Sequence, residues 1–206
     1  METKTKIVNA ASDNGIEEAI NEAAKVIKEG GIAAFPTETV YGIGCDYENE
    51  EALARLREIK KRPPDKPFTA HVGSISAVKK SGCIITRNAE KLMKHFWPGP
   101  LTLLLAGPSG KKAFRMPLNP VALGIIRQSG CFVALPSANL SGDKPPADAE
   151  AVIRDFGGRI QLIVDGGPVR GKESTVIDLT AEPPVIAREG AVSREEIEEV
   201  LGKEIA

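Results

Sequence analysis

Two apolar runs of strand length each end at a proline that is followed by small polar residues. Residues 32–39 read Ile-Ala-Ala-Phe-Pro-Thr-Glu-Thr, and residues 131–139 read Cys-Phe-Val-Ala-Leu-Pro-Ser-Ala-Asn. Proline cannot donate to the hydrogen-bond ladder of a central strand, so we expect each strand to stop there. The polar side chains would then lie at neighbouring strand ends, where a sheet can form a ligand site. The alternative interpretation is a pair of ordinary loops whose hydroxyls bond local backbone groups.

Helical and strand-like patterns alternate over most of the chain, which favours an α/β architecture. Helices are indicated by apolar residues at helical spacing in residues 15–29, and by candidate N-caps at Asn49, Ser74, Asn119, Asp148 and Ser193. Further strands are expected at residues 68–72, 101–106, 160–164, 174–179 and 185–188. The close spacing of the last two indicates some antiparallel pairing. We predict one domain over residues 1–206, with a twisted mixed parallel and antiparallel sheet flanked by helices and no second domain.

Two intervals are expected to lack strands because they are polar or rich in glycine. Residues 37–47 contain Thr37, Glu38 and Thr39, and Gly42 and Gly44 would let the backbone approach another group closely. Residues 107–119 contain three cationic side chains and are expected to form a polar loop.

Composition excludes several classes of protein. The 206 residues carry a formal net charge of −1, which gives no general attraction to nucleic acid or to membranes. No apolar run has the length of a membrane span, and the first residues lead into no signal-peptide core. We therefore expect a soluble cytoplasmic protein without a membrane partner. Its three cysteines are far apart, and the absence of a Cys-x-x-Cys pair favours free thiols over disulfides or structural zinc.

Residues 60–67, Lys-Lys-Arg-Pro-Pro-Asp-Lys-Pro, combine four cations with three prolines. Prolines stiffen the segment, so its cations would lose little entropy when they bind an anion. The alternative is a solvated helix end whose cations complement the helix dipole. His71 follows within the next expected strand, where a lone histidine is most often structural.

Familiar catalytic and nucleotide-binding motifs are absent from the sequence. It has no Walker A loop, no G-x-G-x-x-G after the first expected strand, no G-x-S-x-G elbow and no zinc-ligand spacing. What remains are cations and hydroxyls in loops and at strand ends, and arginine in particular suits bidentate recognition of carboxylate or phosphate. This set could bind a small polyanion, but it contains no obvious nucleophile.

Seven segments, in order, resemble the YrdC-type threonylcarbamoyl-AMP synthase family. They are residues 36–44 (PTETVYGIG), 60–72 (KKRPPDKPFTAHV), 96–103 (FWPGPLTL), 115–117 (RMP), 136–139 (PSAN), 173–176 (ESTV) and Arg188. The resemblance covers nearly the whole chain. It implies a YrdC-like fold: a single α/β domain with a twisted mixed sheet around a positively charged cavity.

The resemblance also implies an activity. Such proteins condense L-threonine, bicarbonate and ATP into threonylcarbamoyl-AMP and pyrophosphate, the first step toward the t6A modification of adenosine 37 in tRNA. The product would pass to downstream t6A transfer machinery, and tRNA is a further candidate partner. Mg²⁺ would enter with ATP, held by the phosphates and not by protein ligands. No covalent enzyme intermediate is required, so the lack of a nucleophile is expected.

The resemblance also implies a role for individual residues of this sequence. Threonine would be held by Thr39, His71, Arg115 and Ser174. ATP would be held by Lys60, Arg62, Lys66, Ser137, Asn139 and Arg188. No residue is assigned as a general base, and Glu38 keeps no defined role. The segment after Ser141-Gly142 lacks the small hydroxyl residue common in the family, and the chain resembles the short form because longer members add a linker and a second domain.

Two other functions remain open at this stage. One is a non-catalytic module that binds tRNA or double-stranded RNA through the same cavity. The net charge and the 4% content of aromatic residues argue against it. The other is a carbamoyl-adenylate module of a different pathway, but such relatives are normally fused to further domains.

Overall fold

The structure is a computed structural model that describes residues 3–206. Its strands are β1 (Lys6–Asn9), β2 (Ala33–Pro36), β3 (Tyr41–Asp46), β4 (Thr69–His71), β5 (Leu101–Gly107), β6 (Gly110–Arg115), β7 (Val133–Ala134), β8 (Leu162–Asp165), β9 (Thr175–Asp178) and β10 (Val185–Arg188). Its helices are α1 (Asp13–Lys28), α2 (Glu50–Ile59), α3 (Ile75–Lys80), α4 (Arg87–Phe96), α5 (Pro120–Ser129), α6 (Ala149–Phe156) and α7 (Arg194–Leu201).

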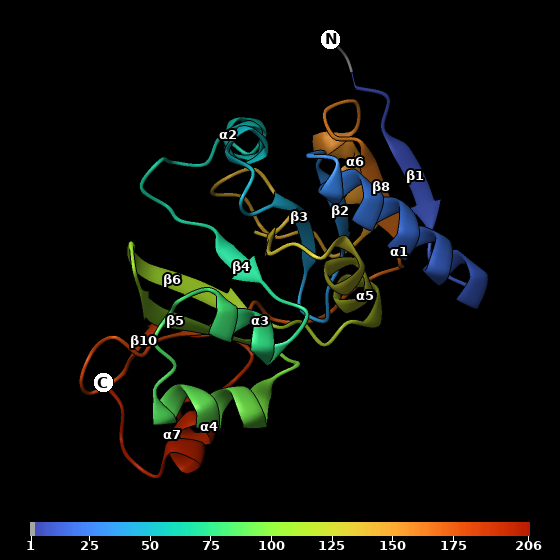
Figure 1. Cartoon of the computed structure of the whole chain (residues 1–206). Helices are drawn as coiled ribbons and strands as arrows, with labels where there is room; N and C mark the ends of the chain where they lie inside the picture. Colours follow the sequence, from blue (N-terminus) through green and yellow to red (C-terminus); the bar gives the residue numbers. More distant parts are fainter. Residues whose placement is uncertain (1–2) are drawn as a thin grey trace.

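All ten strands of the described residues belong to one sheet, in the order β1-β8-β2-β3-β7-β4-β6-β5-β9-β10 (Figure 1). Parallel pairs, such as β4 with β6 and β5 with β9, stand beside antiparallel pairs, such as β2 with β3 and β5 with β6. The predicted α/β fold with a mixed sheet is therefore confirmed. None of the helices in residues 3–206 is long and apolar enough to cross a membrane.

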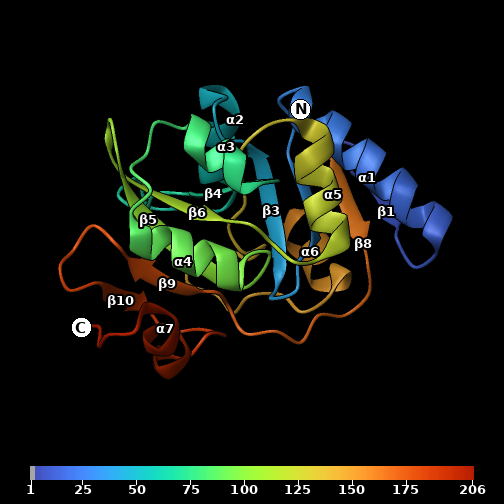
Figure 2. The same ribbon diagram turned by 60° about the horizontal axis from the view of Figure 1, so that its bottom comes forward.

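Side chains that alternate along the strands separate the core into layers. On β2, Ala33 and Phe35 pack with α1 and α5, whereas Ala34 packs with α2 and α6 on the opposite face. A third apolar cluster joins β5, β6 and β9 to α4 and α7. Figure 2 shows these pairs of helices, α1 beside α5 and α4 beside α7. The helices cover the sheet and leave strand ends free to line a site.

The helix starts follow from local capping, as the sequence predicted. The side chains of Asn49, Ser74, Asn119 and Asp148 each accept a hydrogen bond from a backbone N–H in the first turn of the following helix. Ser193 forms a complete capping box at the start of α7. Such caps satisfy backbone donors that the helix itself leaves unpaired.

Two expected loops are strands in the structure. Tyr41–Asp46 forms β3, because Gly42 and Gly44 let it lie tightly against β7; a Cβ atom at Gly44 would be 2.5 Å from the carbonyl oxygen of Ala134. Gly110–Arg115 forms β6, although we expected a polar loop over residues 107–119. The first half of β6 is exposed and carries lysines, so its apolar signal is limited to its buried end.

Tyr41 ties β3 to the loop that follows β8. Its buried hydroxyl donates to the carbonyl oxygen of Gly167 at 2.6 Å and accepts from the N–H of Gly166 at 3.2 Å. Burial raises the pKa of Tyr41 to about 12, so the phenol stays protonated and remains a donor. The bond holds the loop that leads to Ser174.

We predict that Tyr41→Phe lowers the free energy of unfolding by about 1–3 kcal/mol, because it removes two partly buried hydrogen bonds that tie β3 to the loop. Chemical denaturation measures this change. Tyr47→Phe is the matched control, since the Tyr47 hydroxyl forms no hydrogen bond with residues 3–206. Equal losses in the two variants would show that the Tyr41 hydroxyl does not stabilise the loop.

Candidate functional site

Strand ends and loops from the middle of the sheet surround a cavity of about 340 Å³. All ten predicted site residues line it: Thr39, Lys60, Arg62, Lys66, His71, Arg115, Ser137, Asn139, Ser174 and Arg188. The two segments that follow a strand and a proline meet here, since Gly42 of β3 pairs with Ser137 in an isolated bridge. The juxtaposition predicted for these strand ends is therefore confirmed.

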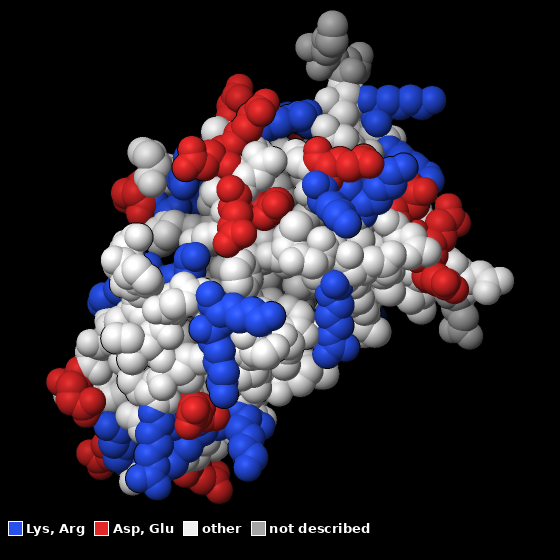
Figure 3. Space-filling view, in the orientation of Figure 1, with Lys and Arg blue, Asp and Glu red and all other residues white. Residues whose placement is uncertain are grey.

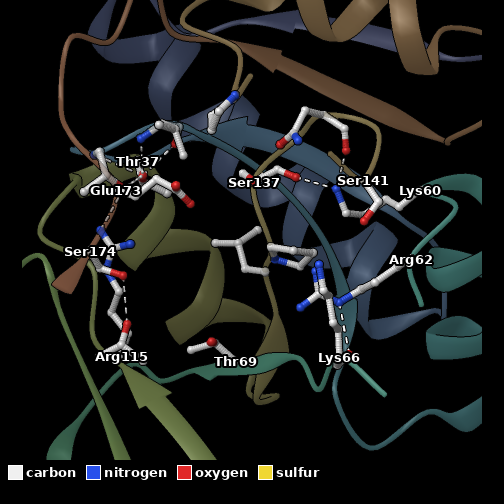
Figure 4. A pocket seen from close by; sticks show the side chains of 18 of the residues that line it. Thr37, Lys60, Arg62, Lys66, Thr69, Arg115, Ser137, Ser141, Glu173 and Ser174 are labelled. Atoms are coloured by element: carbon white, nitrogen blue, oxygen red, sulfur yellow. Dashed lines mark hydrogen bonds between the residues drawn. The ribbon is translucent and has the colours of Figure 1, made fainter. Parts of the chain in front are cut away.

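The cavity has two sides. In Figure 4, Arg115, Ser174 and Glu173 lie on one side, and Lys60, Arg62 and Lys66 lie on the other. Ser137 lies between the two groups. We call these the Arg115 side and the basic-loop side.

Arg115 is a buried cation of the cavity, held by three hydrogen bonds. Its side chain is 7% exposed, and its Nη2 donates to Oε1 of Glu38 at 2.7 Å and to Oγ1 of Thr39 at 3.0 Å. Its Nε donates to the carbonyl oxygen of Gly99 at 3.3 Å. A buried guanidinium is costly to desolvate, and these acceptors offset that cost.

His71 lies next to Arg115 because of strand register. β4 and β6 run parallel with His71 opposite Arg115, which brings together residues far apart in the sequence. Burial, together with the charge of Arg115, lowers the pKa of His71 to about 3. The imidazole is therefore neutral near pH 7, so it can act as a hydrogen-bonding group but is a very weak base.

Ser174 links two further elements to the Arg115 side. Its hydroxyl lies 2.9 Å from Oγ1 of Thr102 on β5, and it accepts from Nη2 of Arg188 at 3.1 Å. Arg188 also donates to the carbonyl oxygen of Ser174 at 2.8 Å and to Oε1 of Glu173 at 2.9 Å. Arg188, assigned to ATP from the sequence, thus lies with the residues assigned to threonine.

Backbone carbonyls hold the basic loop in shape. Arg62 donates from Nε to the carbonyl oxygen of Lys66 at 3.2 Å and from Nη2 to that of Pro67 at 2.7 Å. The guanidinium groups of Arg57 and Arg62 each lie 4.9 Å from the ring centroid of Phe68. The loop is therefore a folded structure in which Arg62 is fixed, and it is more than a solvated helix end.

Lys60 joins the basic loop to the segment of residues 136–143. It is 2% exposed, and its Nζ donates to the carbonyl oxygens of Ser137 at 2.6 Å and Asn139 at 2.5 Å. Burial and the nearby Arg62 lower the pKa of Lys60 to about 8. Two of its three N–H donors are thus committed to shaping this wall.

Asn139 completes the same wall. Its Nδ2 donates to the carbonyl oxygens of Leu140 and Asp143, both at 2.8 Å. Its Oδ1 is buried without a hydrogen-bond partner among the described residues.

Several lining residues were not assigned a role from the sequence. Thr37, Thr69, Thr102 and Glu173 all line the cavity. All four lie within the motifs already quoted, but only the structure shows that their side chains line the cavity. Glu38, which has no role from the sequence, is the ion-pair partner of Arg115.

Charged groups on one face of the molecule are mixed. Figure 3 shows lysine and arginine interspersed with aspartate and glutamate on the face seen in Figure 1.

In the part of the chain that the structure describes, no group of three or more His, Cys, Asp or Glu side chains could hold a metal ion.

Comparisons with known proteins identify a family and relatives with similar sequences. A family model described as Sua5_yciO_yrdC, "Telomere recombination", matches residues 25–190. A protein named threonylcarbamoyl-AMP synthase from Pyrococcus abyssi is 46% identical, over 89% of this chain and 57% of its own length. The Bacillus subtilis protein of the same name is 41% identical, over 98% of this chain and 62% of its own length.

A solved structure has a similar fold. The crystal structure of Pyrococcus abyssi Sua5 complexed with L-threonine superimposes with a TM-score of 0.91 at 43% identity, covering 98% of this chain and 62% of that one. The chain therefore spans less than two thirds of the length of these relatives. By the matched family model and by its similarity to these relatives, the chain is a member of the Sua5/YciO/YrdC family.

Proposed function

We propose that the protein is a threonylcarbamoyl-AMP synthase, an enzyme that makes threonylcarbamoyl-AMP and pyrophosphate from L-threonine, bicarbonate and ATP. The observation that carries the proposal is the cavity itself. It places a fixed arginine with hydroxyls and a neutral imidazole on one side, and a basic loop on the other. The names of the relatives support it, as does the threonine bound to a similar structure.

The Arg115 side suits an amino acid. A guanidinium is the preferred partner of a carboxylate, so Arg115 would bind the threonine carboxylate. Thr39, Ser174 and neutral His71 would hydrogen-bond the amine or the side-chain hydroxyl of threonine. These groups are buried and fixed by their own hydrogen bonds, which favours one substrate orientation.

The basic-loop side suits a nucleotide. Arg62 and Lys66 would hold the phosphates of ATP, while Lys60 keeps Ser137 and Asn139 in place for further contacts. Arg188 would meet the phosphates from the Arg115 side, between the two substrates. The cavity is lined by five cationic side chains and two carboxylates among the described residues, an excess that would attract a polyanion.

The reaction needs positioning more than a nucleophile from the protein. The threonine nitrogen attacks the carbon of bicarbonate or carbon dioxide and forms a carbamate. A carbamate oxygen then attacks the α-phosphorus of ATP, and the bond from that phosphorus to the oxygen bridging toward the β-phosphate breaks, releasing pyrophosphate. When the neutral amine attacks bicarbonate, this first step releases water. When it attacks carbon dioxide, the step releases a proton from the threonine nitrogen. Fixed cations reduce repulsion between the two anions.

Mg²⁺ would enter as part of the Mg-ATP substrate. Phosphate oxygens and water are the ligands it prefers in nucleotide sites. Glu173 and Asp143 are the carboxylates that line the cavity, and Glu173 is already paired with Arg188 at 2.9 Å. The product would be consumed by a downstream enzyme that transfers the threonylcarbamoyl group to tRNA. On this proposal the protein would act in the cytoplasm.

A direct assay tests the proposal. The purified protein is incubated with Mg-ATP, bicarbonate and labelled threonine, and both pyrophosphate and threonylcarbamoyl-AMP are measured. We expect both products, each dependent on threonine. Consumption of ATP without threonine would contradict the proposal, as would a lack of any turnover combined with tight RNA binding.

Substitution of Arg115 tests the assignment of the two sides. We predict that Arg115→Ala weakens threonine binding by at least about tenfold, because the substrate carboxylate loses its charged partner, and weakens ATP binding much less. Isothermal titration with each substrate alone measures both. Equal losses for threonine and ATP would show that Arg115 does not belong to the amino-acid side.

The neutral state of His71 has a consequence for stability. Between about pH 3 and 6.5 the unfolded chain binds a proton on this imidazole that the folded chain excludes, so stability falls as pH decreases. From pH 7 to pH 5 this site should lower the free energy of unfolding by about 2 kcal/mol. The His71→Asn variant should lack that part of the decline in urea unfolding. Identical pH dependence in both proteins would contradict a buried neutral imidazole.

A further inference from the structure

Glu38 joins three parts of the structure that meet at the Arg115 side. It lies in the turn between β2 and β3, and its side chain is 18% exposed. Its Oε1 accepts from Nη2 of Arg115 at 2.7 Å. Its Oε2 accepts from the backbone N–H of Asn119 at 3.2 Å, at the positive end of α5. Both carboxylate oxygens therefore have a donor.

This arrangement holds Glu38 in its charged form. Burial alone would raise its pKa, but the charge and hydrogen bond of Arg115, with backbone N–H groups, outweigh that effect and lower the pKa. A carboxylate that is ionised and doubly bonded is poorly suited to accept a proton during a reaction. Glu38 is therefore not the missing general base.

The contacts of Arg115 leave one part of its guanidinium for a ligand. Its hydrogen bonds to residues 3–206 use Nε and Nη2, and none of them uses Nη1. Arg115 lines the cavity. A ligand carboxylate would therefore meet Nη1, while Glu38 and Thr39 occupy Nη2.

The charge of Glu38 matters because both threonine and ATP carry anionic groups, a carboxylate on threonine and phosphates on ATP. ATP carries several negative charges, and five cations line the cavity. An arginine without a counter-ion would attract phosphate as well as carboxylate. The partly buried Glu38 carboxylate offsets part of the charge of Arg115, so the attraction for a highly charged group is reduced more than that for a single carboxylate.

We propose that Glu38 is a positioning and specificity-determining residue: it fixes Arg115 so that only the Nη1 edge receives a carboxylate, and its charge keeps phosphate groups away from the Arg115 guanidinium. The inference rests on the proposed function, in which the Arg115 side holds threonine. It adds a role for Glu38, and it gives a reason why the ATP phosphates would bind at the basic loop and not at Arg115.

Glu38→Gln tests both parts. The amide keeps the size of the side chain, but its NH₂ group must face either Nη2 of Arg115 or the N–H of Asn119, and both are donors. We expect threonine affinity to fall at least about tenfold, and millimolar inorganic phosphate to become a competitor of threonine. In the wild-type protein the same phosphate should change threonine affinity less than about twofold. Titration calorimetry with and without phosphate measures each value.

Two further variants separate charge from position. Glu38→Asp keeps the charge but is too short to keep both contacts, so it should weaken threonine binding without admitting phosphate. Asp178→Asn is the matched control: Asp178 is 16% exposed and pairs with Lys111 of β6 at 2.6 Å, outside the cavity. It should behave as wild type in threonine and phosphate titrations.

The outcomes are distinct. Phosphate competition with threonine in the wild-type protein would overturn the proposal, and this measurement does not depend on the folding of any variant. Unchanged threonine affinity in folded Glu38→Gln would also overturn it. A wild-type protein that binds no threonine would instead refute the proposed function.

Discussion

The buried guanidinium of Arg115 imposes the main physical constraint on this fold. Taking a cation out of water costs several kcal/mol unless acceptors surround it, and removing one partner of such a pair typically costs about 3–5 kcal/mol. The acceptors come from separate segments: Glu38 and Thr39 after β2, and Gly99 before β5. The charge is compensated only when these segments reach their final positions, so the site and the fold are stabilised together.

Strand register supplies the rest of the site. The parallel pairing of β4 with β6 sets His71 beside Arg115, and that of β5 with β9 sets Thr102 near Ser174. On the opposite side, the buried Lys60 connects the basic loop to the wall that contains Ser137 and Asn139. The arginines of the Arg115 side are thus paired with carboxylates, and the basic-loop side is the more cationic of the two. That asymmetry is what a reaction between an amino acid and a nucleotide needs.

The sequence predicts those parts of the fold in which a residue acts on the backbone next to it, such as helix caps and strand ends. The N-caps Asn49 and Asn119 and the end of β2 at Pro36 follow from backbone chemistry, and they are confirmed. The second strand is shorter than expected, because β7 ends at Ala134, before Pro136. The site residues came from family motifs, and the structure brings them to one cavity although their individual roles stay predictions.

What could not be predicted depends on long-range contacts. β6 carries lysines on its exposed end, so its strand character appears only through pairing with β4 and β5. β3 contains glycines because β7 lies so close, a reason that is invisible before the sheet is assembled. Glu38 had no role for the same reason: its partners Arg115 and Asn119 are distant in sequence.

The central claim, one cavity with an amino-acid side and a nucleotide side, is tested most directly by a crystal structure with L-threonine and a non-hydrolysable ATP analogue. We predict the threonine carboxylate at Nη1 of Arg115 and the phosphates at Arg62 and Lys66. A phosphate on Arg115, or a carboxylate on the basic loop, would contradict the account.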